Sequence, residues 1–160
     1  MIRALWPALA SFGAGLVWFA TAAGSPLAVA IPVGALGALH LVWAFAVLRA
    51  ERVVMPRASI AGGLVGLVAA AFLLLTGPLA LVPFLALFIF QWSIAIAAVI
   101  EVRRGSAARE GNRGTRRAGV FALALVIQAM LVAAIATPAL AASEAGEFAV
   151  PHGTFHHGGH

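Results

Sequence analysis

The sequence predicts an all-α integral membrane protein built as a bundle of five transmembrane helices. First, 63% of its 160 residues are hydrophobic, the mean hydropathy is +1.06, and only 9% are charged, whereas about a quarter of a soluble domain is charged. Second, the charges are confined to short islands between long uncharged runs. A water-soluble fold cannot hide that much apolar surface.

Five apolar runs are long enough to cross a bilayer, which takes a helix of roughly 20 residues. We expect these helices at residues 4–23, 27–48, 58–76, 79–100 and 118–140. Turn signals that end in Pro26 and Pro78 separate the first helix from the second and the third from the fourth. The bundle is therefore predicted to contain two tandem helical hairpins and one further helix within residues 1–141, followed by a flexible tail at 142–160.

An internal similarity agrees with two related hairpins. A shift of 51 residues aligns Pro32 with Pro83 and His40 with Gln91. Such a period indicates duplication of a structural unit. Chance matching in alanine-rich apolar sequence is the alternative explanation.

Arginine positions predict the direction of the chain, because cytoplasmic loops carry an excess of Lys and Arg. The link between the second and third helices holds Arg49, Arg52 and Arg57, the link between the fourth and fifth holds six more, and Arg3 precedes the first helix. With five spans, all ten arginines lie on one side. We therefore expect a bacterial-type inner (cell) membrane protein with a cytoplasmic N-terminus and an extracytoplasmic C-terminus.

Two segments also resemble signal sequences. The first helix is one, and residues 116–142 are the other, with an Ala-x-Ala cleavage pattern that ends at Ala141. Cleavage after Ala141 is the alternative to a fifth spanning helix. We favour spanning helices in both places, because each segment is long enough to cross the bilayer.

The net charge of +5 does not predict nucleic-acid binding, because the arginines form no basic face interleaved with aromatic residues. Their expected partners are the lipid bilayer and its anionic headgroups. Cysteine is absent, which excludes disulfides and thiolate chemistry. The sequence has no phosphate-binding glycine loop and no nucleophile motif, and we therefore expect no enzyme.

Three polar residues, His40, Gln91 and Gln128, lie near the middle of their spans, where polar groups are costly. One interpretation is that they hydrogen-bond between helices and hold the bundle together. The alternative is a midplane binding site or proton path of a small transporter or channel. Two small-x-x-x-small patterns, Ser11 with Gly15 and Gly62 with Gly66, predict close helix packing within the bundle or against a partner.

The tail carries four of the five histidines within nine residues, namely His152, His156, His157 and His160. Imidazole nitrogens bind Zn and Cu, and the intervening glycines allow several nitrogens to reach one ion. We therefore expect a transition-metal site on the extracytoplasmic side, with a polar terminus without specific function as the alternative.

Tryptophan commonly anchors helices at membrane interfaces. By position we expect Trp18 at the outer interface and Trp92 packed inside the bundle. Taken together, these features predict a non-enzymatic accessory or assembly subunit that associates with a membrane-protein partner or with copies of itself. The sequence does not determine the ligand, the metal, the oligomeric state or the partner.

Overall fold

The computed structural model describes residues 2–105 and 118–143. These residues form five helices and no strand: α1 (Ile2–Ala23), α2 (Leu27–Ala50), α3 (Pro56–Thr76), α4 (Leu81–Gly105) and α5 (Ala118–Ala141). The helices α1 to α4 are long and apolar enough to cross a membrane, and α5 contains a shorter apolar stretch, Val126–Ala141. The all-helical prediction is confirmed, and the four long apolar helices indicate a membrane protein.

Local chemistry fixes the end of α3 and the start of α4. The helix α3 stops at Gly77, whose φ of 97° is a left-handed conformation that glycine adopts without strain. The next residue, Pro78, has no N–H, and the N–H of Leu79 instead donates to the Leu73 carbonyl at 3.2 Å. Leu79 therefore belongs to the turn, and α4 begins two residues later than predicted.

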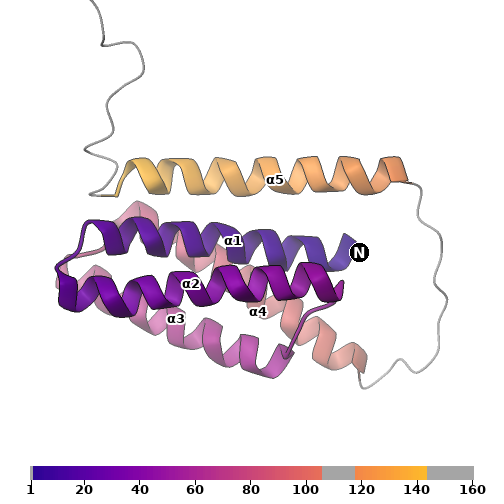
Figure 1. The fold of residues 1–160 in the computed structure, drawn as a ribbon, viewed down its shortest axis with the longest axis horizontal. Coiled ribbons are helices and arrows are strands. Elements are labelled where there is room, and N and C mark those ends of the chain that lie inside the picture. Colours follow the sequence, from indigo (N-terminus) through magenta and orange to yellow (C-terminus); the bar gives the residue numbers. More distant parts are fainter. Residues whose placement is uncertain (1, 106–117, 144–160) are drawn as a thin grey trace, which may run out of the picture.

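The helices α1 and α4 form the centre of the bundle (Figure 1). The helix α1 packs against α2, α4 and α5, whereas α4 packs against α3, α1 and α5. The N-terminus, the α2–α3 link, the C-terminal end of α4 and the start of α5 all lie at one end. A duplicated hairpin with twofold symmetry would pair α2 with α3 as closely as α1 pairs with α4, and the described residues show no such packing.

Glycine determines how closely α1 and α2 approach. A Cβ atom added to Gly15 would lie 3.1 Å from the Gly37 carbonyl oxygen, and one added to Gly37 would lie 3.1 Å from the Gly15 oxygen. Both contacts are tighter than ordinary van der Waals spacing. The two backbones therefore lie against each other, as small residues permit in membrane helices.

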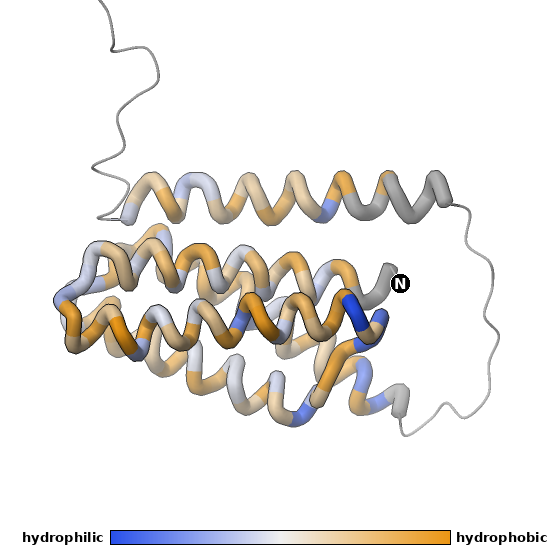
Figure 2. Tube along the Cα trace, viewed as in Figure 1, coloured by the Kyte–Doolittle hydropathy of each residue, from blue (hydrophilic) through white to orange (hydrophobic). Residues whose placement is uncertain are grey.

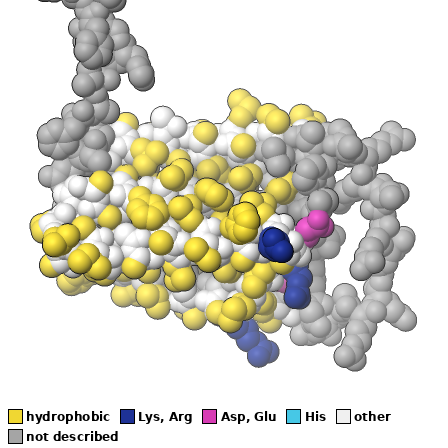
Figure 3. Space-filling model, in the orientation of Figure 1, with side chains coloured by type: hydrophobic (Ala, Val, Ile, Leu, Met, Phe, Trp, Pro, Cys, Tyr) yellow, Lys and Arg dark blue, Asp and Glu magenta, His cyan; other side chains and the backbone are white. Residues whose placement is uncertain are grey.

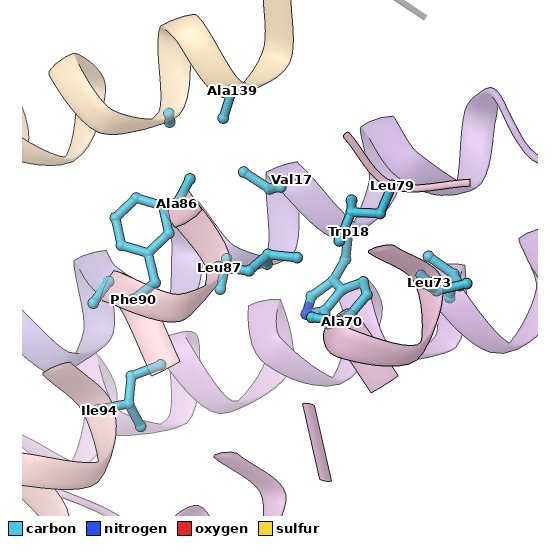
Figure 4. Packing of buried hydrophobic residues seen from close by; sticks show 14 residues of the cluster. Val17, Trp18, Ala70, Leu73, Leu79, Ala86, Leu87, Phe90, Ile94 and Ala139 are labelled. Atoms are coloured by element: carbon cyan, nitrogen blue, oxygen red, sulfur yellow. The ribbon is translucent and has the colours of Figure 1, made fainter. Parts of the chain in front are cut away.

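The core surrounds α1 and α4 and takes side chains from all five helices (Figure 4). Its largest fully buried apolar side chains include Trp18, Leu87 and Phe90, which pack with Ala70 of α3 and Ala139 of α5. The prediction for tryptophan was wrong at both positions. Trp18 is fully buried and cannot act as an interface anchor, whereas Trp92 is 55% exposed and stacks on Phe88.

The outer surface of the described helices is mostly apolar along their length (Figures 2 and 3). Large hydrophobic side chains such as Phe45 of α2 and Val68 and Phe72 of α3 are more than 60% exposed. The exposed arginines lie at the end of the bundle that holds the N-terminus. Arg49 is in the last turn of α2, Arg52 in the α2–α3 link, Arg57 at the start of α3 and Arg103 near the end of α4. This apolar belt with cations at one end is the surface expected of helices in lipid.

Candidate functional site

A direct hydrogen bond joins His40 of α2 to Gln91 of α4, with 2.9 Å between their Nε2 atoms. Among the described residues, α2 packs closely against α1, and α3 packs closely against α4. The His40–Gln91 contact is therefore a side-chain tie between the α1–α2 and α3–α4 pairs. Hydrogen bonds of this kind are worth about 0.6 to 2 kcal/mol between membrane helices.

The hydrogen bonds of His40 define its tautomer. Its Nδ1 lies 2.8 Å from the Leu36 carbonyl oxygen, which only accepts hydrogen bonds, and therefore Nδ1 carries the hydrogen. In the neutral ring Nε2 is then an acceptor, and the Gln91 amide group donates to it. Turning the Gln91 amide over would place its oxygen against the unprotonated Nε2, so the amide orientation is fixed as well.

The Gln91 side chain fills a space beside α3 that exists because Gly66 has no side chain. The Gln91 side chain is 1% exposed and lies against Gly63 and Gly66 of α3. A Cβ atom on Gly66 would overlap with Gln91 Nε2. Gly66 therefore makes room for the polar side chain, whose Oε1 is buried without a hydrogen-bond partner.

Ser11 brings α1 into the same site. Its Oγ donates to the His40 backbone carbonyl at 2.8 Å, and Ser11 is fully buried. This bond sets the position of His40 relative to α1 along the helix axis. It belongs to the same α1–α2 contact in which the backbones of Gly15 and Gly37 lie against each other. Three helices thus contribute Ser11, His40 and Gln91 to one polar centre.

Gln128 lies on a different side of the bundle. It belongs to α5, which packs against α1 and α4, and its buried Oε1 has no hydrogen-bond partner. One turn further along α5, Val132 approaches Gly13 of α1 together with Phe90 of α4. Phe90 and Gln91 are neighbours in sequence and therefore point about 100° apart around α4. The structure joins His40 to Gln91 and places Gln128 on the α5 side of α4.

The predicted metal ligands His152, His156, His157 and His160 lie outside the described residues. Within residues 2–105 and 118–143, no cluster of three or more His, Cys, Asp or Glu could hold a metal ion.

Sequence reasoning identified His40 and Gln91 but assigned no role in the site to Ser11 or Gly66. The available signal was the pair of small-x-x-x-small patterns, since each pattern contributes one residue to the centre. Such patterns predict close packing in general. They do not say which polar side chain will use the space.

The fold and this site together define a helical protein of membrane type with an internal polar tie. Comparison with known protein families, curated proteins and solved structures gives no match to the chain.

Proposed function

We propose that this chain is a non-enzymatic accessory or assembly subunit of a membrane-protein complex. The observation that carries the proposal is the His40–Gln91 hydrogen bond, in which a fully buried Gln91 fills the space beside Gly66. The polar residues at mid-span are engaged in helix packing, as expected of a rigid scaffold. The outer helices α2 and α3 retain long apolar faces for contact with lipid and a partner helix.

The proposal is tested by site-specific photo-crosslinking in native membranes. A crosslinking residue at Val68, on the exposed face of α3, is expected to yield a discrete protein adduct. The same residue at Phe45, on the exposed face of α2, tests the other outer helix. Lipid adducts alone at both positions would contradict a role as an assembly subunit, and an adduct of twice the chain mass would identify a second copy as the partner.

The proposed topology has five spans in a bacterial-type inner membrane, with a cytoplasmic N-terminus and tandem helical hairpins. The support is the position of Arg49, Arg52, Arg57 and Arg103 at one end of the bundle. Because the chain has no cysteine, single cysteines can be introduced without background. We expect Ser25→Cys to react with an impermeant reagent from outside the cell and Arg52→Cys to react only after the membrane is opened.

A metal-binding role for the tail is part of the proposal, with Cu or Zn held by the histidines from His152 to His160. The support is the spacing of the imidazole groups and glycines in the sequence. Calorimetric titration of the full chain is expected to show stoichiometric binding near pH 7.4 that weakens below about pH 6.5, where histidine protonates. A chain truncated after Val150 should lose this binding. Equal binding by both chains would exclude the tail as the site.

A small transporter or channel is the second candidate function. The observation in its favour is the buried, unpartnered Oε1 of Gln91 beside a histidine that is only partly buried. This candidate predicts that His40→Ala abolishes flux in proteoliposomes while leaving the helical content unchanged. Solute or proton flux that is equal with and without the protein would remove this candidate.

A further inference from the structure

The two ring nitrogens of His40 differ in how they respond to a proton. The Nδ1–H donates to the Leu36 carbonyl oxygen at 2.8 Å, and this bond is the same in the neutral and the protonated ring. The Nε2 atom lies 2.9 Å from Gln91 Nε2 and accepts a hydrogen bond in the neutral ring. It becomes a second donor when the ring binds a proton. Only the contact with Gln91 therefore depends on the protonation state.

The Gln91 amide already carries the acceptor that a protonated ring requires. Its Oε1 is buried and has no hydrogen-bond partner among the described residues, whereas its Nε2 faces the histidine. An unpaired acceptor inside a membrane is costly. Rotation of the amide by half a turn about its last side-chain bond exchanges the two atoms. Oε1 then faces His40 Nε2 and can accept from it.

The helix α3 leaves room for this rotation. A Cβ atom added to Gly66 would overlap with Gln91 Nε2, and one added to Gly63 would lie 3.9 Å from Gln91 Oε1. Two glycines therefore lie beside the two ends of the amide. Because the amide oxygen and nitrogen are nearly equal in size, their exchange needs no movement of α3.

No other titratable group faces His40 from the helices around it. Within the spans, residues 4–48, 58–100 and 118–141 contain no Asp, Glu, Lys or Arg and no second histidine. Arg49 is nine residues further along α2, or about 14 Å along the helix axis. The charge of a protonated His40 must therefore be stabilised by hydrogen bonds and not by an ion pair. The first charged residues beyond the spans of the surrounding helices are Arg3 of α1, Arg49 of α2, Arg57 of α3 and Glu101 of α4.

We propose that His40 and Gln91 form a proton-binding site in which the Gln91 amide rotates when His40 Nε2 takes up a proton. His40 is only partly buried, so its ring is the group that the proton can reach. One proton enters from water, no covalent bond of the protein breaks, and the site gains one positive charge. Both N–H groups of the imidazolium then donate to oxygen atoms, those of the Leu36 carbonyl and of Gln91 Oε1.

The consequence is a tie between α2 and α4 that persists in both protonation states. The bonds of the imidazolium are charge-assisted and therefore stronger than the neutral N–H···N bond that is replaced. With the amide fixed, protonation would instead bring two donors face to face and break the tie. The site requires neither partner docking nor transport, and its failure would leave the accessory-subunit proposal untouched.

Infrared spectroscopy of the full chain in lipid nanodiscs tests this site, with glutamine labelled by carbon-13 at its side-chain carbonyl. The sequence contains Gln91 and Gln128 as its glutamines, so Gln128→Leu leaves Gln91 as the only labelled carbonyl. We expect its band to move to lower frequency between about pH 8 and about pH 5, on either side of the ordinary titration range of histidine. The reason is that a free carbonyl becomes a hydrogen-bond acceptor. The shift should be absent when His40→Asn is added, because asparagine does not bind the proton.

Gln128 is the matched control. Its buried Oε1 also lacks a partner, but no hydrogen bond joins it to His40. In Gln91→Met, which leaves Gln128 as the only labelled carbonyl, the band should stay in place on acidification. A Gln91 band that does not move would overturn the proposal, as would an equal shift at Gln128 or in the presence of His40→Asn.

A double-mutant cycle between His40→Ala and Gln91→Leu separates rotation of the amide from breakage of the tie. Rotation predicts that the coupling free energy stabilises the protein at both about pH 8 and about pH 5. A fixed amide predicts that the coupling vanishes or changes sign at the lower pH. Loss of the coupling on acidification would therefore contradict the proposal, even if the infrared band moved.

Discussion

The helices α1 and α3 face opposite environments although both are long enough to cross a membrane. Within the chain, 61% of the span in α1 is buried, against 28% of the span in α3. The buried helix is the less apolar of the two and carries Ser11, Thr21 and Trp18 toward other helices. The exposed helix presents Val68, Phe72 and other large apolar side chains outward. In a soluble protein the more apolar helix would be the more buried one.

This reversal follows from the solvent. Lipid tails are as apolar as leucine, and burial of apolar side chains therefore drives helix association only weakly. Polar groups, in contrast, must be satisfied inside the protein. The interior of this bundle thus collects the hydrogen-bonding side chains and small residues, while large aliphatic residues face outward.

The largest expected difference in stability between the inner and outer faces comes from replacing tryptophan. Trp18→Ala removes a fully buried ring and leaves a cavity, and the expected loss of stability is about 3 to 5 kcal/mol. Trp92→Ala, on the outer face, should cost less than about 1 kcal/mol. Unfolding of both variants by denaturing detergent measures the difference. Equal losses would break the distinction between the inner and outer faces of the bundle.

The next effect compares two glycines on one helix. Gly66→Ala places a Cβ atom against the Gln91 amide, and we expect a loss of about 1 to 3 kcal/mol. Gly62→Ala meets no atom within 4 Å and gains helix propensity, so its stability should be unchanged or slightly higher. The same unfolding assay compares them. If Gly62→Ala were the more damaging change, the side of α3 that faces Gln91 would be assigned wrongly.

A double-mutant cycle addresses the polar tie between the helix pairs. His40→Ala and Gln91→Leu are combined, and the expected coupling free energy is about 0.6 to 1.7 kcal/mol. The control cycle pairs His40→Ala with Ser93→Ala, since the Ser93 hydroxyl donates to the Ile89 carbonyl within its own helix. Coupling of the same size in both cycles would indicate a general effect on α4 rather than the direct bond.

The smallest expected effect concerns the serine that reaches α2. Ser11→Ala deletes the bond to the His40 carbonyl, which retains its helical environment, and about 0.5 to 1.5 kcal/mol of stability should be lost. Thr76→Ala is the exposed counterpart, because its hydroxyl bonds only to Phe72 of its own helix. A loss at Thr76 as large as that at Ser11 would show that the position of Ser11 between helices confers no advantage.

The five helices and the membrane class could be predicted from the amino-acid sequence alone. In lipid, every backbone N–H and C=O must be hydrogen-bonded within its own segment. Uncharged apolar runs of about 20 residues therefore form helices there. Proline and glycine marked the α1–α2 and α3–α4 turns, although the Leu79 N–H bonds to the Leu73 carbonyl and α4 begins only at Leu81. The end of α2 carried no such signal, because its cap is Glu51, a non-glycine residue with a φ of 55°. The mid-span positions of His40 and Gln91 were also predicted from the sequence.

Which helix faces pack against each other could be learned only from the folded bundle. An apolar helix shows almost the same composition on every side, so the pattern of the sequence cannot tell the lipid face from the protein face. That ambiguity is why Trp18 and Trp92 were assigned to the wrong surroundings. The pairing of Gln91 with His40, and its separation from Gln128, depends on the rotation of α4 against its neighbours. Single glycines such as Gly66 set that rotation, because Gln91 of α4 fills the space where a side chain would be. The sequence of α3 alone does not show which residue fills that space.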